Sequence, residues 1–288
     1  MTTHLECYPC MVKHIVHVAR MLTNDESLQH KVMIKVLEAL PKFSEDTAPP
    51  EMATEVQRII RSIFKTKDPY KKIKDKYNTI ALEMYPSLKK SVKLSSDPLL
   101  MAVKLAIAGN IIDFGTVDGS IDLEGTIQHC LRTDITINDF DNFQKDLSTV
   151  TSILYLGDNT GEIVFDKILI EEIKKITTAP ITFAVRGMPV LNDVTMEDAV
   201  LVGMNHLAVL VSNGYDAPAT MLPHCSEEFL EHYHKADMII AKGMGNYESL
   251  CNENKKIYFI LKAKCAVVAR DLKCNVNDNI LLKNKFGR

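Results

Sequence analysis

The chain has 288 residues, of which 46% are hydrophobic and 25% are charged, the balance of a soluble globular protein. This composition excludes a disordered, collagen-like or coiled-coil chain, and the length fits two domains of ordinary size better than one large domain. The 34 Lys and Arg residues are nearly balanced by 37 Asp and Glu residues, so the net charge of -3 argues against nucleic acid as a partner.

No segment of the sequence has the features of a membrane span or a secretion signal. The apolar run 99–112 is interrupted by Lys104 and Asn110 and is shorter than the ~20 residues that span a bilayer. The first ten residues lack a basic segment followed by an apolar one. The seven cysteines, an odd number, favour reduced thiols over a disulfide framework. We therefore expect a cytoplasmic protein without a membrane partner.

Apolar residues in the first part of the chain recur at intervals of three and four residues, which is typical of amphipathic helices. Prolines separate the periodic segments, which are 11–22, 32–40 and 56–63. The pattern predicts a helical domain over residues 1–95. The segment 97–132 is also helical by pattern and fits either domain, so the boundary at 95/96 has an alternative near residue 148.

Short apolar runs alternate with helical stretches from about residue 150 onward. Most recur every ~20 to 30 residues, the period of βαβ units, and continuous apolar strands suit a parallel sheet covered on both faces. The expected strands are 153–156, 181–185, 207–211, 238–241, 257–261 and 266–269. The predicted fold class is therefore α/β, with an N-terminal helical domain followed over residues 96–288 by a Rossmann-like parallel-sheet α/β/α domain.

Oxygen-bearing side chains follow two of these strands. Ligands bind beyond the carboxyl ends of the strands in an open parallel sheet, and Asp158, Asn159 and Asp193 lie at such positions. Their oxygens suit a hard cation such as Mg²⁺ or Mn²⁺. Each of these side chains also suits a helix N-cap, which is the structural alternative.

Basic and amide side chains follow the other strands. Arg186, Lys242 and Lys264 offer positive charge for an anion such as phosphate, and Asn213 follows the third strand. Polar residues at five strand ends are harder to explain by helix capping alone. Together with the acidic residues they indicate a metal-assisted phosphoryl site.

Several common motifs are absent or incomplete. The sequence has no G-x-G-x-x-G after the first strand, no P-loop, no H-E-x-x-H and no G-x-S-x-G, which argues against a dinucleotide site, a zinc peptidase and an α/β-hydrolase. Cys7-x-x-Cys10 lacks a second pair. It is either part of a metal or redox site or two ordinary thiols at a helix start.

Several segments resemble the DUF89 family of metal-dependent damage-control phosphatases, also described as ARMT1-like. The segments are L-G-D-N-T-G-E-I-V-F-D (156–166), V-R-G-M-P-V-L-N-D-V-T (185–195), S-N-G (212–214) and A-K-G-M-G-N-Y (241–247). A-G-N-I-I-D-F-G (108–115) and the opening C-x-x-C look like the cysteine-bearing, microbial-type subgroup. The resemblance covers nearly the whole chain and implies the two-domain fold described above.

The resemblance also implies roles for individual residues. A divalent metal, with Mn, Mg, Co and Ni as candidates, would be held at the positions of Asp158, Asn159 and Asp193. Asn110 and Asp113 would lie near the substrate, and Lys242 would contact phosphate.

We therefore expect a metal-dependent phosphatase that hydrolyses phosphate monoesters of small metabolites, either sugar phosphates or damaged phosphometabolites. In this mechanism the metal activates a water that attacks in line. Lys242, helped by Arg186, neutralises charge on the phosphoryl oxygens. Glu162 or Asp166 orients the water.

Two other functions are compatible with the sequence. A Rossmann-like domain also suits an S-adenosylmethionine-dependent methyltransferase, and Cys7 with Cys10 suits a non-catalytic metal-binding protein. A requirement for a divalent ion rather than the sulfonium cofactor separates the first from the phosphatase. Oxygen rather than thiolate ligation of the metal separates the second.

Overall fold

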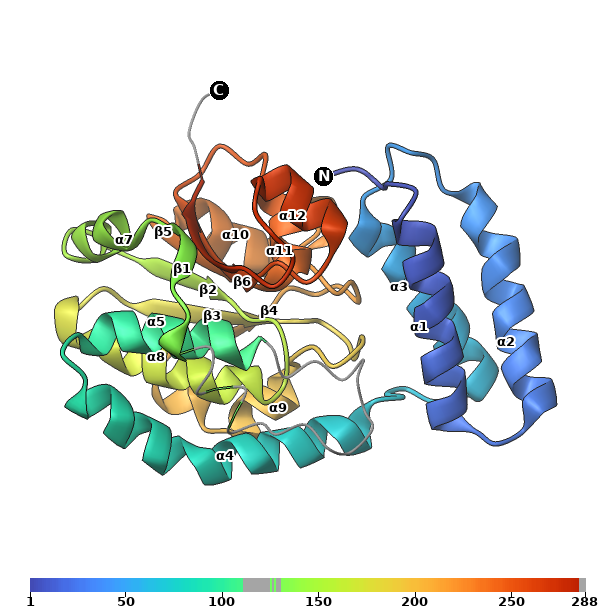
Figure 1. Ribbon diagram of the computed structural model, residues 1–288, viewed down its shortest axis with the longest axis horizontal. Helices are drawn as coiled ribbons and strands as arrows, with labels where there is room; N and C mark the ends of the chain where they lie inside the picture. The colour runs from blue at the N-terminus through green and yellow to red at the C-terminus, as the bar shows by residue number, and fades with distance from the viewer. Residues whose placement is uncertain (111–124, 126, 128–130, 285–288) are drawn as a thin grey trace.

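The computed structural model describes residues 1–110, 125, 127 and 131–284, and Figure 1 shows two groups of elements. The helices α1, α2 and α3 lie together beside a larger domain built on a sheet. The described helices are α1 (Cys7–Leu22), α2 (Glu26–Ala39), α3 (Pro49–Phe64), α4 (Lys71–Leu94), α5 (Pro98–Gly109), α7 (Phe140–Leu147), α8 (Glu162–Ile176), α9 (Met196–Leu201), α10 (Glu227–Lys235), α11 (Gly243–Leu250) and α12 (Ala266–Leu272). None of them is long and apolar enough to cross a membrane.

The described strands form one sheet in the order β1-β7-β6-β5-β2-β3-β4. The central strands β2 to β6 run parallel, whereas β7 is antiparallel to β6 and pairs in parallel with β1. The carboxyl ends of β2, β3, β4, β5 and β6 therefore meet at one edge of the sheet. The strands are β1 (Ile135–Asn138), β2 (Ile153–Leu156), β3 (Ile181–Val185), β4 (Val209–Ser212), β5 (Met238–Lys242), β6 (Ile257–Lys262) and β7 (Asn279–Lys283).

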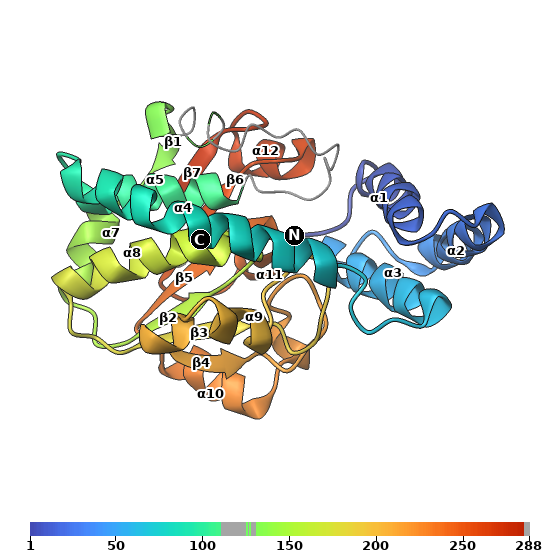
Figure 2. The same cartoon turned by 90° about the horizontal axis from the view of Figure 1, so that it is seen from below.

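Helices cover both faces of the sheet, as the continuous apolar strands predict. Successive residues of a strand point to opposite faces, so Ile153 and Tyr155 pack with α5 and α8, whereas Leu154 and Leu156 pack with α10, α11 and α12. Figure 1 and Figure 2 show α4, α5 and α8 on one side of the strands and α10, α11 and α12 on the other. This three-layer arrangement and its mostly parallel sheet confirm the predicted α/β fold class.

The helices α1, α2 and α3 enclose a separate hydrophobic core, which we call the bundle core. Its buried side chains include Ile15, Val36, Met52 and Ile60. The helix α4 leaves this bundle and runs along α8, where Ala81, Leu88 and Val92 join the core of the sheet domain. The division of the chain at residue 96 remains a prediction, and α4 is the element that spans both groups.

One predicted strand needs correction, and two strands were not predicted. The run 266–269 is not a strand but part of helix α12, where the Cys265 side chain accepts a hydrogen bond from the N–H of Val268 and caps the first turn. A short apolar run does not distinguish a strand from a buried helix. The sequence analysis also missed β1 and β7, because neither has a long apolar run.

Candidate active site

Asp158 and Asn159 lie in a tight turn between β2 and α8. A Cβ on Gly157 would lie 2.7 Å from a neighbouring aromatic ring, and Gly161 has φ +74°, a left-handed conformation that favours glycine. Asn159 forms an isolated β-bridge with Asp193, and the N–H that follows Asp193 donates to the carbonyl of Asp158 at 2.8 Å. These constraints bring the ends of β2 and β3 together, with both predicted acidic ligands in one site.

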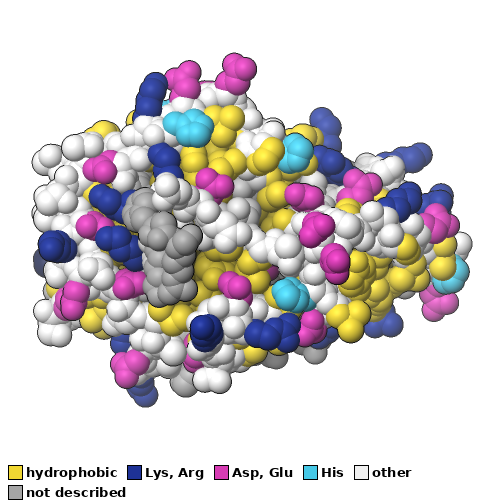
Figure 3. Space-filling view, turned by 90° about the horizontal axis from the view of Figure 1, so that it is seen from above, with side chains coloured by type: hydrophobic (Ala, Val, Ile, Leu, Met, Phe, Trp, Pro, Cys, Tyr) yellow, Lys and Arg dark blue, Asp and Glu magenta, His cyan; other side chains and the backbone are white. Residues whose placement is uncertain are grey.

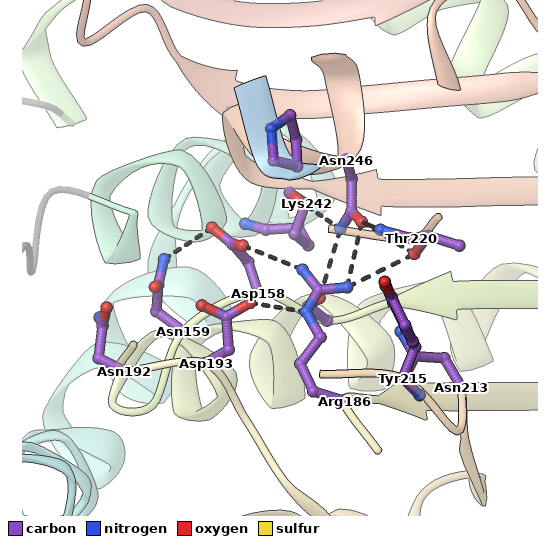
Figure 4. Close-up of polar contacts among 12 residues, drawn as sticks. Asp158, Asn159, Arg186, Asn192, Asp193, Asn213, Tyr215, Thr220, Lys242 and Asn246 are labelled. Carbon is purple, nitrogen blue, oxygen red and sulfur yellow. Dashed lines mark hydrogen bonds and ion pairs between the residues drawn. The ribbon is translucent and has the colours of Figure 1, made fainter. Parts of the chain in front are cut away.

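Arg186, which follows β3, joins the two acids. Its Nε donates to Asp193 Oδ2 at 2.6 Å, and its Nη2 donates to Asp158 Oδ1 at 3.4 Å. Its Nη1 donates to Asn246 Oδ1 at 3.2 Å and to Thr220 Oγ1 at 3.5 Å, so the guanidinium is held from several sides (Figure 4). Because it is only 3% exposed, Arg186 provides a fixed positive charge beside the acids.

Burial raises the pKa of both acids. For Asp158, repulsion from Asp193 and Glu162 adds to the effect of burial, while attraction to Arg186 and Lys264 opposes it. For Asp193, burial outweighs the opposing effect of Arg186. The raised pKa values show that the basic side chains do not fully compensate these carboxylates. A divalent cation beside them would stabilise their charged forms.

The donor set fits a hard divalent cation. The Nδ2 of Asn159 donates to Asp158 Oδ2 at 2.7 Å and to Glu162 Oε2 at 2.9 Å, which leaves its Oδ1 as an acceptor. Within the described part of the chain, no three Asp, Glu, His or Cys side chains converge as a metal-binding group. The predicted set has two carboxylates and one amide, and it leaves coordination positions for water and phosphate oxygens, as is usual for Mg²⁺.

Lys242 faces the interior of the sheet domain. Its Nζ lies 2.5 Å from the carbonyl oxygen of Ala106, 3.0 Å from Glu162 Oε1 and 3.1 Å from Asp166 Oδ1. Burial alone would lower the pKa of Lys242, but attraction to Asp166 and Glu162 raises it. The ammonium therefore donates to one carbonyl and forms ion pairs with two carboxylates, and in this arrangement it holds Glu162 in place beside the proposed metal ligands.

Asp166 lies one helical turn after Glu162 on α8, and both carboxylates form ion pairs with Lys242. Tyr155 Oη donates to Asp166 Oδ1 at 2.7 Å. Burial raises the pKa of Asp166 to about 7, although Lys242 opposes the shift. Asp166 therefore lies behind Glu162 rather than beside Asp158, so its contacts favour a supporting role over direct orientation of water.

Asn110 connects the two groups of acids. It follows α5, and its Nδ2 donates to Asp158 Oδ2 at 3.1 Å and to Glu162 Oε2 at 2.9 Å. Its Oδ1 is buried and has no hydrogen-bond partner among the described residues. Asp113, the other predicted substrate contact from this segment, lies outside the described residues.

The remaining predicted site residues lie further from the acids. Asn213 follows β4, but its Oδ1 accepts the N–H groups of Gly187 and Tyr215 at 2.9 and 3.0 Å, so it joins the loops after β3 and β4. Lys264 follows β6, is half-buried, and is close enough to Asp158 for its charge to oppose the rise in the pKa of that carboxyl.

The sequence analysis missed side chains that support this site. Asn246 Oδ1 accepts the Thr220 N–H at 3.0 Å as well as Arg186, and Asn246 belongs to the quoted K-G-M-G-N segment, which was the available signal. In the same segment, a Cβ on Gly243 would lie 1.9 Å from Asp158 Oδ2, so glycine is required there. Asn78 on α4 accepts the N–H of the glycine that precedes α8 at 2.8 Å, and nothing in the sequence indicated it.

The described domain has three α/β layers, and a buried acid pair, a fixed arginine and a lysine-bound glutamate meet at one edge of its sheet, an arrangement that suits phosphoryl-transfer enzymes. The chain belongs to the damage-control phosphatase ARMT1-like domain family, whose model matches residues 3–280. This membership confirms the family resemblance and the enzyme class predicted from the sequence, a phosphatase.

Individual relatives extend over nearly the whole chain. The damage-control phosphatase PH1575 of Pyrococcus horikoshii is 35% identical over 290 residues, covering 99% of both chains. An uncharacterised protein of Methanocaldococcus jannaschii is 39% identical, covering 96% of this chain and 94% of its own. The crystal structure of a DUF89 family protein from Pyrococcus horikoshii superimposes with a TM-score of 0.90 at 35% identity, covering 99% of this chain and 100% of that one.

Proposed function

We propose that this phosphatase depends on a divalent metal and hydrolyses phosphate monoesters of small metabolites, either sugar phosphates or damaged phosphometabolites. The observation that carries the proposal is the buried pair Asp158 and Asp193, joined by Arg186 at the carboxyl edge of the parallel strands. Relatives named damage-control phosphatase, such as PH1575, support the same reaction class.

Asp158, Asn159 and Asp193 would hold the metal, with Mn, Mg, Co and Ni as candidates. When bound, such an ion polarises phosphoryl oxygens and lowers the pKa of a bound water. Arg186 keeps the two carboxylates in a fixed orientation through its Nε and Nη2. Lys264 adds positive charge on the β6 side, which favours the approach of an anionic ester.

Glu162 would orient and deprotonate the attacking water. Its Oε2 accepts the amides of Asn110 and Asn159, and its Oε1 lies against Lys242. A carboxylate held in this way remains an acceptor beside the metal ligands, as general-base catalysis requires. Lys242 would then promote the reaction chiefly through Glu162. To contact phosphate directly, its ammonium would have to give up its contact with Ala106, Glu162 or Asp166.

The test is a screen of phosphate monoesters against Mn²⁺, Mg²⁺, Co²⁺ and Ni²⁺ on the purified protein. We expect hydrolysis that disappears with a chelator and returns when the metal is restored. Calorimetry with the metal alone provides an independent measure of the site. Full hydrolysis of several esters in the presence of the chelator would contradict the metal dependence.

We further propose a small-molecule phosphate ester as the partner and the cytoplasm as the location. Free thiols at six described cysteines agree with a reducing compartment. Figure 3 shows acidic and basic side chains intermixed over one face of the molecule, a distribution without the single-sign surface that attracts nucleic acid. Both proposals are tested by fractionating cells and by identifying the phosphate ester that accumulates when the enzyme is absent.

A further inference from the structure

Asn192 has a buried amide group that the proposed mechanism does not use. It immediately precedes Asp193, and its side chain is only 9% exposed. Its Nδ2 has no hydrogen-bond partner within residues 1–110, 125, 127 and 131–284. A buried donor without a partner is destabilising and uncommon, so a group of this kind beside a candidate site is available to bind a ligand.

The backbone of Asn192 fixes this amide beside the proposed metal ligands. Its carbonyl accepts the N–H of Thr160 at 2.9 Å and the Thr160 Oγ1 at 3.1 Å. The neighbouring residues Asn159 and Asp193 form the β-bridge described above. In Figure 4 the side chains of Asn192 and Asn159 lie next to one another on the same side of Asp193. The unpartnered amide therefore lies beside two of the proposed metal ligands.

Leu191 holds the preceding backbone in a strained conformation. Its φ of +46° is in the left-handed region, which a bulky residue other than glycine rarely adopts. Its side chain packs against the bundle core of α1, α2 and α3. Arg61 of α3 also donates to the carbonyl of Pro189 at 3.0 Å, so the bundle contacts this loop at two points. Strain of this kind persists where the surrounding structure imposes it, and it is concentrated at functional sites.

We propose that Asn192 binds substrate by donating its side-chain N–H to a phosphoryl oxygen of the metal-bound ester, and that Leu191 is the residue that positions it. This inference rests on the phosphatase function proposed above. Phosphate is the ligand class that fits, because the amide lies beside Asp193 and Asn159, which in the proposed function would hold the metal that binds the phosphate ester. The helical bundle then acts on phosphate recognition from outside the sheet domain.

The first test compares Asn192→Ala and Asn192→Asp with the wild type. Asn142→Ala, an exposed asparagine of α7, is the control. Affinity for inorganic phosphate is measured by calorimetry with saturating Mn²⁺, and affinity for Mn²⁺ is measured separately. We expect Asn192→Ala to lose at least tenfold in phosphate affinity while its Mn²⁺ affinity stays within threefold. Asn192→Asp, which adds a negative charge in the same volume, should lose more.

Two results overturn the role of Asn192. One is phosphate affinity in Asn192→Ala equal to that of the wild type. The other is a parallel loss of Mn²⁺ and phosphate affinity, which would make Asn192 a support for Asp193 only. If Asn192→Ala does not fold, Asn192→Ser replaces it, because serine keeps a short donor. The phosphate affinity of Asn192→Ser should lie between those of the wild type and Asn192→Asp. Phosphate affinity equal to that of the wild type in both Asn192→Ser and Asn192→Asp overturns the role.

The second test asks whether Leu191 acts through Asn192. Leu191→Ala should weaken phosphate binding several-fold, and the double variant with Asn192→Ala should bind phosphate no more weakly than Asn192→Ala alone. A purely structural role for Leu191 would instead give additive losses. Additive losses therefore overturn the positioning role of Leu191 and leave the direct test of Asn192 unaffected.

Failure of this inference is distinguishable from failure of the proposed function. A wild type that hydrolyses esters with Mn²⁺ while Asn192→Ala binds phosphate normally keeps the phosphatase and removes the role of Asn192. A wild type that binds phosphate only with Mn²⁺, through Asn192, but hydrolyses no ester keeps the binding site and removes the phosphatase. A wild type that binds no phosphate with Mn²⁺ overturns the inference whatever the screen shows.

Discussion

Two buried cations at the same sheet edge, Arg186 and Lys242, each contact two carboxylates, yet their surroundings differ. Arg186 joins Asp158 and Asp193, and Asp158 retains 8% exposure. Lys242 joins Glu162 and Asp166, and all three side chains are fully buried. The Arg186 group therefore lies slightly nearer the surface than the Lys242 group.

Amide side chains connect the two groups. Asn110 and Asn159 each donate to Asp158 Oδ2 and to Glu162 Oε2. These two amides therefore bridge the groups by hydrogen bonds. The difference in exposure predicts that the Arg186 group controls metal affinity and that the Lys242 group controls turnover, and variants in each group test this division.

The largest effects are expected from Asp158→Asn and Asp193→Asn. Each removes an anionic ligand from a set of three, so metal affinity and phosphatase activity should fall by more than the ~10- to 100-fold typical of residues that only support ligands. The measurements are calorimetry with Mn²⁺ and activity at limiting Mn²⁺. Asp141→Asn, an exposed acid of α7, is the control. Unchanged Mn²⁺ affinity in either site variant would mean that the metal binds elsewhere.

Lys242→Met should lower turnover and stability while leaving Mn²⁺ affinity within about threefold. It leaves Glu162 and Asp166 buried without a cation, and breaking a buried ion pair in this way costs ~3 to 5 kcal/mol of unfolding free energy. Activity should fall more than tenfold, and adding Asp166→Asn should recover part of the lost stability.

Urea unfolding and steady-state kinetics measure the two effects of Lys242→Met. The control is Lys235→Met, which removes an exposed ion pair with Glu231 and should change stability little. A stability close to that of the wild type, or a large loss of Mn²⁺ affinity, would contradict the division between the two groups.

Asp166→Asn should change how stability depends on pH. Burial raises the pKa of Asp166 in the folded protein to about 7, whereas an unfolded aspartate titrates near ~4. The stabilising contribution of this group is therefore complete below ~4 and is lost as the pH rises through about 7. Asparagine does not titrate, so the variant should lose less stability over this range than the wild type.

Urea midpoints at pH 5 and pH 8, measured with chelator, check the prediction for Asp166. The exposed-acid variant Asp141→Asn should keep the pH dependence of the wild type. Activity in Asp166→Asn should fall several-fold, less than in Lys242→Met, because Lys242 keeps Glu162 as a partner. Equal pH dependence in Asp166→Asn and the wild type would contradict the assignment.

The sequence predicted the central part of the fold because β2, β3, β5 and β6 are continuous apolar runs separated by helix-length segments. It missed β7 because the apolar part of that strand is only Ile280-Leu281-Leu282, and β1 because its four residues alternate in burial. It misread α12 because four buried apolar residues fit a strand as well as a helix. Hydrophobic patterns thus specify long buried strands and leave short edge elements undetermined.

For the site, the rule that ligands bind beyond parallel strand ends brought Asp158, Asp193 and Arg186 together correctly. It did not give side-chain direction, so it did not show that Lys242 faces Glu162 in the interior. Asn78 and Asn192 depend on partners distant in the chain or on an unusual backbone angle, and neither leaves a local signal in the sequence. The individual roles of all these residues stay predictions.

The smallest effect on phosphatase activity is expected from Cys7→Ser/Cys10→Ser, because both residues lie on α1 in the helical bundle and not at the sheet edge. Both thiols belong to the first turn of α1, where Cys7 is buried and Cys10 is exposed. Burial raises the pKa of the Cys7 thiol, which disfavours the thiolate that a metal ligand requires. Thiolates also suit softer metals than the ion expected between Asp158 and Asp193.

Turnover of p-nitrophenyl phosphate with Mn²⁺ should therefore stay within about twofold of the wild type in Cys7→Ser/Cys10→Ser. Any loss of stability should appear as a lower urea midpoint. A loss beyond tenfold in a folded double variant would place the cysteines in the chemistry and favour a metal site built around them.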